Sequence, residues 1–131
     1  MNYTVNHLKI FLLLVAVHSF FVALGLIFIP AEYFIEFGYN PITENFFRAQ
    51  GGVFHLVMVA AYLIAMQDPY TNKVMVKFSI IAKTIAVVFL FSYFVFVERN
   101  LVILLSGVGD LIMALIILFL SYKIKLFDGR K

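Results

Sequence analysis

The sequence predicts an all-α integral membrane protein, a four-transmembrane-helix bundle formed by a single domain over residues 1–131. Of the 131 residues, 64% are hydrophobic and only 13% are charged, and the mean hydropathy is +1.04. Soluble domains are nearer half apolar and a quarter charged, and a chain of this size cannot bury so much apolar surface in water. In addition, four apolar runs are each long enough to cross a bilayer, at residues 8–29, 46–66, 78–97 and 101–122.

The first run is too long for a secretory signal, and no cleavage pattern follows it before Pro30, so we expect it to remain as a span. In the loop that follows, Pro30 suits a first helical position, acidic and aromatic residues alternate, and Gly38 is a natural stop. These signals predict a short helix lying on the outer membrane surface.

Three further signals set the ends of the spans. Asn40-Pro41 is typical of an N-cap and first turn, which would start the helix of the second span before the hydrocarbon. Asp68-Pro69 ends that span, because proline disfavours helical backbone in the residue before it. The turn Glu98-Arg99-Asn100 is so short that the third and fourth spans must form an antiparallel hairpin.

The basic residues are distributed unequally between the loops, and this bias sets the orientation of the chain. One side has only Arg48 and Arg99. The other side, which holds both termini and the second loop, has Lys9, Lys73, Lys77, Lys123, Lys125, Arg130 and Lys131. We therefore expect both termini in the cytoplasm and the protein in the cell (inner or plasma) membrane. The net charge of +3 then reflects topology and predicts no nucleic-acid partner.

Three titratable residues lie at nearly the same depth in three different spans. With about 1.5 Å of rise per residue, His18 is about 15 Å from its membrane surface, and His55 and Asp110 are each about 13 Å from theirs. Such groups are costly at membrane depth. We therefore expect the three side chains to meet in one interior site.

Lys83 lies only about 8 Å into the third predicted span, and its role has two interpretations. Its long side chain is able to carry the ammonium group back to the headgroups. The alternative is an ion pair with Asp110, which would keep that carboxyl group ionised.

The second span presents Arg48, Gly52, His55 and Tyr62 on one helical face. Arg48 is interpreted as an interfacial anchor paired with Glu44 one turn earlier, or as part of the site that His55 suggests. Small residues in two spans predict close helix packing: Gly51 and Gly52 in the second, and Ser106, Gly107 and Gly109 in the fourth.

The polar residues are compatible with three functions. His18 and His55 are candidate axial ligands of a haem or chlorin, with Arg48 above for a propionate. His18, His55 and Asp110 could instead relay protons or line a pocket for a quinone or a lipid headgroup. The third possibility is a structural subunit whose polar interior only fixes the packing.

Catalytic motifs are missing from the sequence. It has no cysteine, no glycine-rich phosphate loop, no HExxH and no nucleophile elbow. These observations favour a protein that is not an enzyme.

Three stretches of the sequence have the pattern of a known family: Phe47-Arg48-Ala49-Gln50-Gly51-Gly52, Gly109-Asp110-Leu111 and the segment from Gly25 to Pro30. They resemble the DoxX-like small four-helix membrane proteins. The resemblance covers residues 8–122. It implies a four-helix membrane bundle serving as an accessory subunit of a membrane redox or electron-transfer complex, assembled with other membrane subunits or with itself. Within the candidate site it marks only Arg48, Gly51, Gly52 and Asp110.

Overall fold

The computed structural model describes residues 3–41 and 45–128, and every regular element in these residues is a helix. The helices are α1 (Tyr3–Phe28), α2 (Ala31–Glu36), α3 (Asn45–Gln67), α4 (Lys73–Phe96) and α5 (Leu101–Lys123). All but α2 are long and apolar enough to cross a membrane, so the four predicted spans are present as helices. Two of them, α1 and α4, begin five residues earlier than the predicted spans, because apolar composition marks the hydrocarbon depth and the helical backbone continues beyond it.

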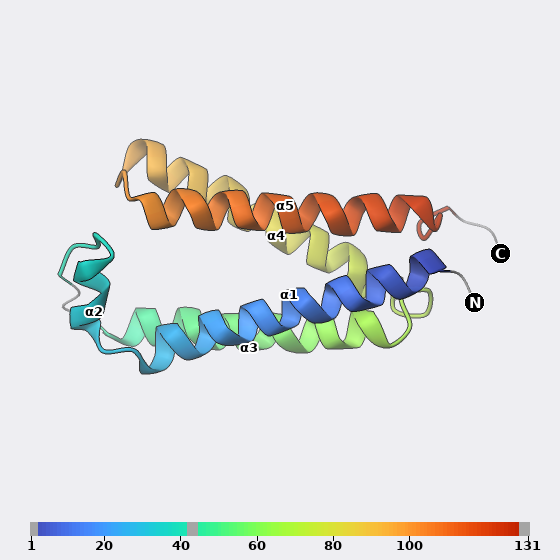
Figure 1. Ribbon diagram of the computed structural model, residues 1–131, viewed down its shortest axis with the longest axis horizontal. Coiled ribbons are helices and arrows are strands. Elements are labelled where there is room, and N and C mark those ends of the chain that lie inside the picture. Colours follow the sequence, from blue (N-terminus) through green and yellow to red (C-terminus); the bar gives the residue numbers. More distant parts are fainter. Residues whose placement is uncertain (1–2, 42–44, 129–131) are drawn as a thin grey trace.

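The long helices are arranged as two closely packed antiparallel pairs (Figure 1). The most extensive contacts join α1 to α3 and α4 to α5, and the contacts between the pairs are fewer. The hairpin predicted for the last two spans is therefore present. α1 begins and α5 ends at the same end of the bundle as the α3–α4 loop, while α2 and the α4–α5 turn lie at the opposite end (Figure 1).

Glycine lets the two helices of each pair approach closely. A Cβ atom on Gly52 of α3 would lie 2.6 Å from Ile27 Cγ1 and 2.9 Å from the backbone oxygen of Ala23, both in α1. A Cβ atom on Gly107 of α5 would lie 2.9 Å from the ring of Phe91 in α4. These two glycines thus occupy helix–helix contacts, as in other membrane bundles.

The other three predicted packing residues do not share this role. A Cβ atom on Gly51 would make only an ordinary 3.8 Å contact, one on Gly109 would meet nothing within 4 Å, and Ser106 is exposed. The reason is rotational: successive helical residues point about 100° apart, so neighbours of a contact residue face elsewhere. Within the described chain, Ser106 and Gly109 therefore lie away from the helix–helix contacts.

The stop predicted at Gly38 is present, as a Schellman motif that ends α2. Gly38 has a φ of +84°, and its N–H donates to Ile35 O at 2.9 Å. The N–H of Tyr39 donates to Phe34 O at 3.1 Å, and the rings of these two residues pack edge to face, 5.9 Å apart. A side chain with Cβ is strained at this positive φ, so glycine is the favoured residue.

The early start predicted at Asn40-Pro41 for the helix of the second span was wrong. Both residues are non-helical, and the helical residues described in α3 begin at Asn45. A proline fixes φ at a value that loops share with a first helical turn, so this local signal does not distinguish the two. Glu44, the predicted partner of Arg48, lies outside the described residues.

Side chains organise the two short connections. At the end of α3, which stops at Gln67 as predicted, Asp68 accepts hydrogen bonds from the Thr71 hydroxyl at 2.6 Å and the Tyr70 N–H at 3.1 Å. The bond from Thr71 is the main reason that the pKa of Asp68 is lowered. In the α4–α5 turn, Asn100 Oδ1 caps α5 by accepting from the N–H of Val102 at 2.7 Å. Asn100 Nδ2 donates to Phe37 O at 3.3 Å, which ties α2 to the hairpin.

Replacing Gly52 by Ala should destabilise the α1–α3 pair, because the new methyl group would collide with the backbone oxygen of Ala23. We expect a loss of about 1–3 kcal/mol in the free energy of unfolding, measured by circular dichroism in detergent micelles. Gly109→Ala is the matched control, since space is open there, and it should be neutral or stabilising by up to about 1 kcal/mol. Equal losses in the two variants would contradict the assigned contact.

Asn100→Ala should lower the free energy of unfolding by about 1–2 kcal/mol, because it removes the cap of α5. Asn100→Asp keeps the accepting oxygen and loses only the donation to Phe37, so its loss should be smaller. The free energies of unfolding of the two variants are compared by circular dichroism in detergent micelles, as for Gly52→Ala. An aspartate variant as unstable as the alanine variant would show that capping is not the main contribution.

Candidate ligand-binding site

A buried ion pair joins α4 to α5 near the middle of both helices. Lys83 Nζ lies 2.5 Å from Asp110 Oδ1, and the two side chains are only 5% and 13% exposed. The sequence allowed two interpretations of Lys83, and the structure shows the second of them, an ion pair with Asp110. A charged partner of opposite sign is what makes either ion tolerable away from water.

The earlier start of α4 explains how Lys83 reaches Asp110. Because α4 begins at Lys73, Lys83 lies about 15 Å along the helix, deeper than a start at residue 78 implies. Asp110 lies about 13 Å along α5 in the opposite direction. The short turn fixes the antiparallel register, so the two residues face each other at nearly the same level.

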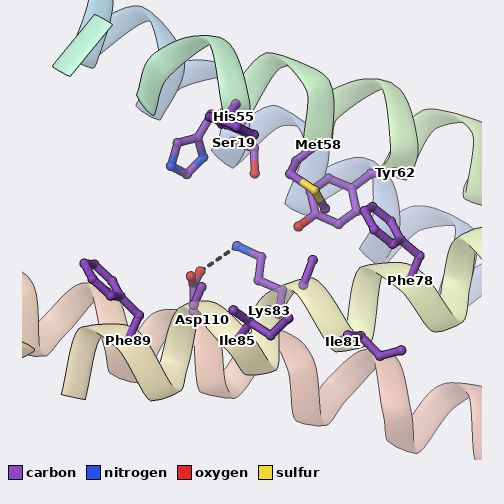
Figure 2. Close-up of a pocket in the computed structure, with 13 residues that line it drawn as sticks. Ser19, His55, Met58, Tyr62, Phe78, Ile81, Lys83, Ile85, Phe89 and Asp110 are labelled. Atoms are coloured by element: carbon purple, nitrogen blue, oxygen red, sulfur yellow. Dashed lines mark hydrogen bonds and ion pairs between the residues drawn. The ribbon is translucent and has the colours of Figure 1, made fainter. Parts of the chain in front are cut away.

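The ion pair faces a cavity of about 480 Å³ between the two helix pairs. Figure 2 shows Ser19, His55 and Tyr62 on one side, with Lys83 and Asp110 on the other. The remaining wall is apolar and comes mostly from α3 and α4. A mainly apolar cavity of this size with a few convergent polar groups has the usual character of a small-molecule site.

The cavity reaches the outer surface between α3 and α4. Three of its lining residues are largely exposed: Phe54 of α3 at 65%, and Ile85 and Phe89 of α4 at 64% and 60%. α3 and α4 belong to different pairs and make few contacts with each other. The site therefore opens through the apolar side of the bundle, not at one of its ends.

Ser19 is a site residue that the sequence analysis missed. It is fully buried, it lines the cavity, and its hydroxyl has no hydrogen-bond partner. Tyr62 is 1% exposed, and its hydroxyl approaches Ser19 without completing a bond of normal geometry. Ser19 continues the buried stripe of Leu8, Leu12 and Val15 at helical spacing, a signal present in the sequence.

The predicted meeting of His18, His55 and Asp110 is found only in part. His55 and Asp110 line the same cavity, but His18 is exposed on α1 and is not among the lining residues. His18 remains within electrostatic range of Lys83 and Asp110. A bis-histidine haem would need both imidazoles to face one space, so this arrangement does not fit haem or chlorin ligation. Nor do the described residues contain a cluster of three or more side chains suited to a metal ion.

Arg48 lies near the end of the bundle where α2 is located, away from the cavity. Its guanidinium donates to Ile29 O, just after the end of α1, and to Asn45 Oδ1 at 3.3 Å. The same group lies 5.0 Å from the centre of the Phe34 ring. Arg48 thus connects α1, α2 and α3, and these contacts fit the anchoring interpretation.

A double-mutant cycle should reveal the coupling between Lys83 and Asp110. Lys83→Met and Asp110→Asn should each lower the free energy of unfolding by about 3–5 kcal/mol, because each leaves one buried charge unpaired. The double variant should lose clearly less than the sum of the two, as measured by thermal unfolding in detergent. Lys77→Met, at an exposed lysine of the same helix, is the control and should stay within about 0.5 kcal/mol of the parent. Strictly additive losses would contradict a direct ion pair.

Comparison with other proteins identified no relative of this chain. No protein-family model, no curated protein and no solved structure matches the chain. The resemblance to DoxX-like proteins stays a prediction, and the functional argument rests on the cavity and its side chains.

Proposed function

We propose that this protein is a multi-pass protein of the cell membrane with both termini in the cytoplasm, and that its central cavity binds a lipophilic molecule with a polar head. The cavity carries the proposal: it lies midway along four apolar helices and combines an apolar wall with a buried ion pair, an imidazole and two hydroxyl groups. A protein that used these groups only for packing would be expected to leave no such space between them.

The proposed orientation is supported by the charges at the two ends of the bundle. Lys73 begins α4, Lys123 ends α5 and Lys9 lies in the second turn of α1, at the end of the bundle where α1 begins and α5 ends (Figure 1), as the positive-inside rule requires of a cytoplasmic side. The opposite end has Glu32 and Glu36 in α2, which also has exposed aromatic and aliphatic side chains. α2 would then lie on the outer membrane surface, with these apolar residues among the lipid headgroups.

The lateral opening supports uptake from the bilayer. Phe54, Ile85 and Phe89 flank it, and in a membrane these exposed side chains would face lipid tails. A ligand is then able to place its head beside Lys83 and Asp110 while its tail extends between α3 and α4. Quinones and neutral lipids both have this shape.

The other predicted functions have less support. A proton relay needs a continuous series of polar groups, and within the described residues no hydrogen bond extends the Lys83–Asp110 pair toward either end of the bundle. The accessory role in a redox complex depends on the family resemblance and on a partner, so it stays a prediction.

Photolabelling tests the proposed site. A long-chain alkyl probe with a diazirine in its tail, added to the protein in liposomes, should label peptides of α3 and α4 that line the cavity. Ala86→Phe places an aromatic ring in the cavity and should weaken this labelling about tenfold, equivalent to about 1.4 kcal/mol of binding energy.

The matched control is Ala60→Phe, at an exposed residue of α3 that does not line the cavity. It should leave the labelling unchanged. Labelling spread evenly over the outer faces of all four long helices, and insensitive to Ala86→Phe, would exclude the site.

A further inference from the structure

We infer that the cavity selects a lipid whose head is uncharged and carries oxygen, such as a long-chain alcohol, ketone or acylglycerol, over a fatty acid or amine of equal length. This inference rests on the proposed function, since it concerns the ligand of the same cavity. It follows from the charge balance at the head of the cavity and from an unused hydroxyl group there.

The charge balance argues against an ionised head. Lys83 and Asp110 are the only Lys, Arg, Asp or Glu residues among the described side chains that line the cavity, and their charges cancel at a separation of 2.5 Å. A carboxylate that displaced Asp110 from Lys83 would leave Asp110 buried and unpaired, and an ammonium group would do the same to Lys83. An unpaired buried charge is strongly unfavourable, whereas a neutral head leaves the pair intact.

The hydrogen-bonding groups argue for oxygen in the head. Ser19 is fully buried, yet its hydroxyl has no partner. By contrast, Ser79 and Thr84 of α4 donate to the carbonyl oxygens of Met75 and Ile80, four residues earlier. Burying a hydroxyl group without a partner is unfavourable, so an oxygen atom on the ligand would satisfy Ser19.

The groups around Ser19 are suited to the same head. The Tyr62 hydroxyl lies beside Ser19 and points into the cavity (Figure 2). Lys83 has three N–H donors and uses one of them on Asp110. A hydroxyl or carbonyl oxygen placed between the two helix pairs would thus meet several donors without adding charge.

Three probes with the same saturated chain test the inference: the primary alcohol, the carboxylic acid and the amine, at a pH where the last two are ionised. Each is added to the purified full-length protein in detergent, and its affinity is measured by competition with the photoprobe. We expect the alcohol to compete most strongly. Ser19→Ala should weaken the alcohol about three- to tenfold, the value of one hydrogen bond. Ser121→Ala is the matched control and should change nothing, since Ser121 is also buried without a partner but does not line the cavity.

Charge variants supply an independent readout. Asp110→Asn leaves Lys83 unpaired and should shift the preference from the alcohol toward the acid, and Lys83→Met should shift it toward the amine. An acid or amine that outcompetes the alcohol on the parent protein, or charge variants with unaltered preference, would overturn the inference and leave the site standing. Equal losses in Ser19→Ala and Ser121→Ala would also overturn it. Failure of every probe, together with photolabelling that is not confined to the cavity, would instead overturn the proposed function.

Discussion

The structure depends on the cost of placing charge among apolar side chains. Lys83 and Asp110 lie 2.5 Å apart and neutralise each other, whereas either charge alone at this position would be strongly destabilising. Their pairing requires that α4 and α5 run antiparallel in one register, which the short turn and the Asn100 cap provide. The turn at the end of the bundle thus determines the chemistry at its centre.

The cavity arises because close packing is concentrated within the pairs. Gly52 and Gly107 bring the helices of each pair together, whereas the exposed side chains of Phe54 and Phe89 flank an opening between α3 and α4. The two pairs remain apart along this line, and the polar groups of all four long helices meet in the space between them. Helix association in membranes relies on such close contacts, and the contacts between the pairs are fewer, which leaves room for a ligand.

The polar residues of this bundle fall into two classes, those that connect helices at one end and those that line the cavity. Arg48 and Asn100 hold α2 and its neighbours at one end through bonds to backbone oxygens. Ser19, His55 and Tyr62 face the cavity and make no such bond. The residues marked by the family resemblance are divided between these classes, since Arg48 belongs to the first and Asp110 to the cavity. The resemblance therefore marks Asp110 of the cavity, but not Ser19, His55, Tyr62 or Lys83.

The sequence alone determined what depends on position along the chain. Apolar runs identified the four long helices, Gly38 and Asp68-Pro69 marked where helices stop, and the depth of Asp110 identified it as a buried charge in need of a partner. Only the tertiary structure decided what depends on rotation about each helix axis. His18 and Ser19 are adjacent in sequence and equal in depth, yet packing against α3 exposes the imidazole and buries the hydroxyl. Because successive side chains point about 100° apart, the face that becomes the interior is chosen by the neighbouring helix.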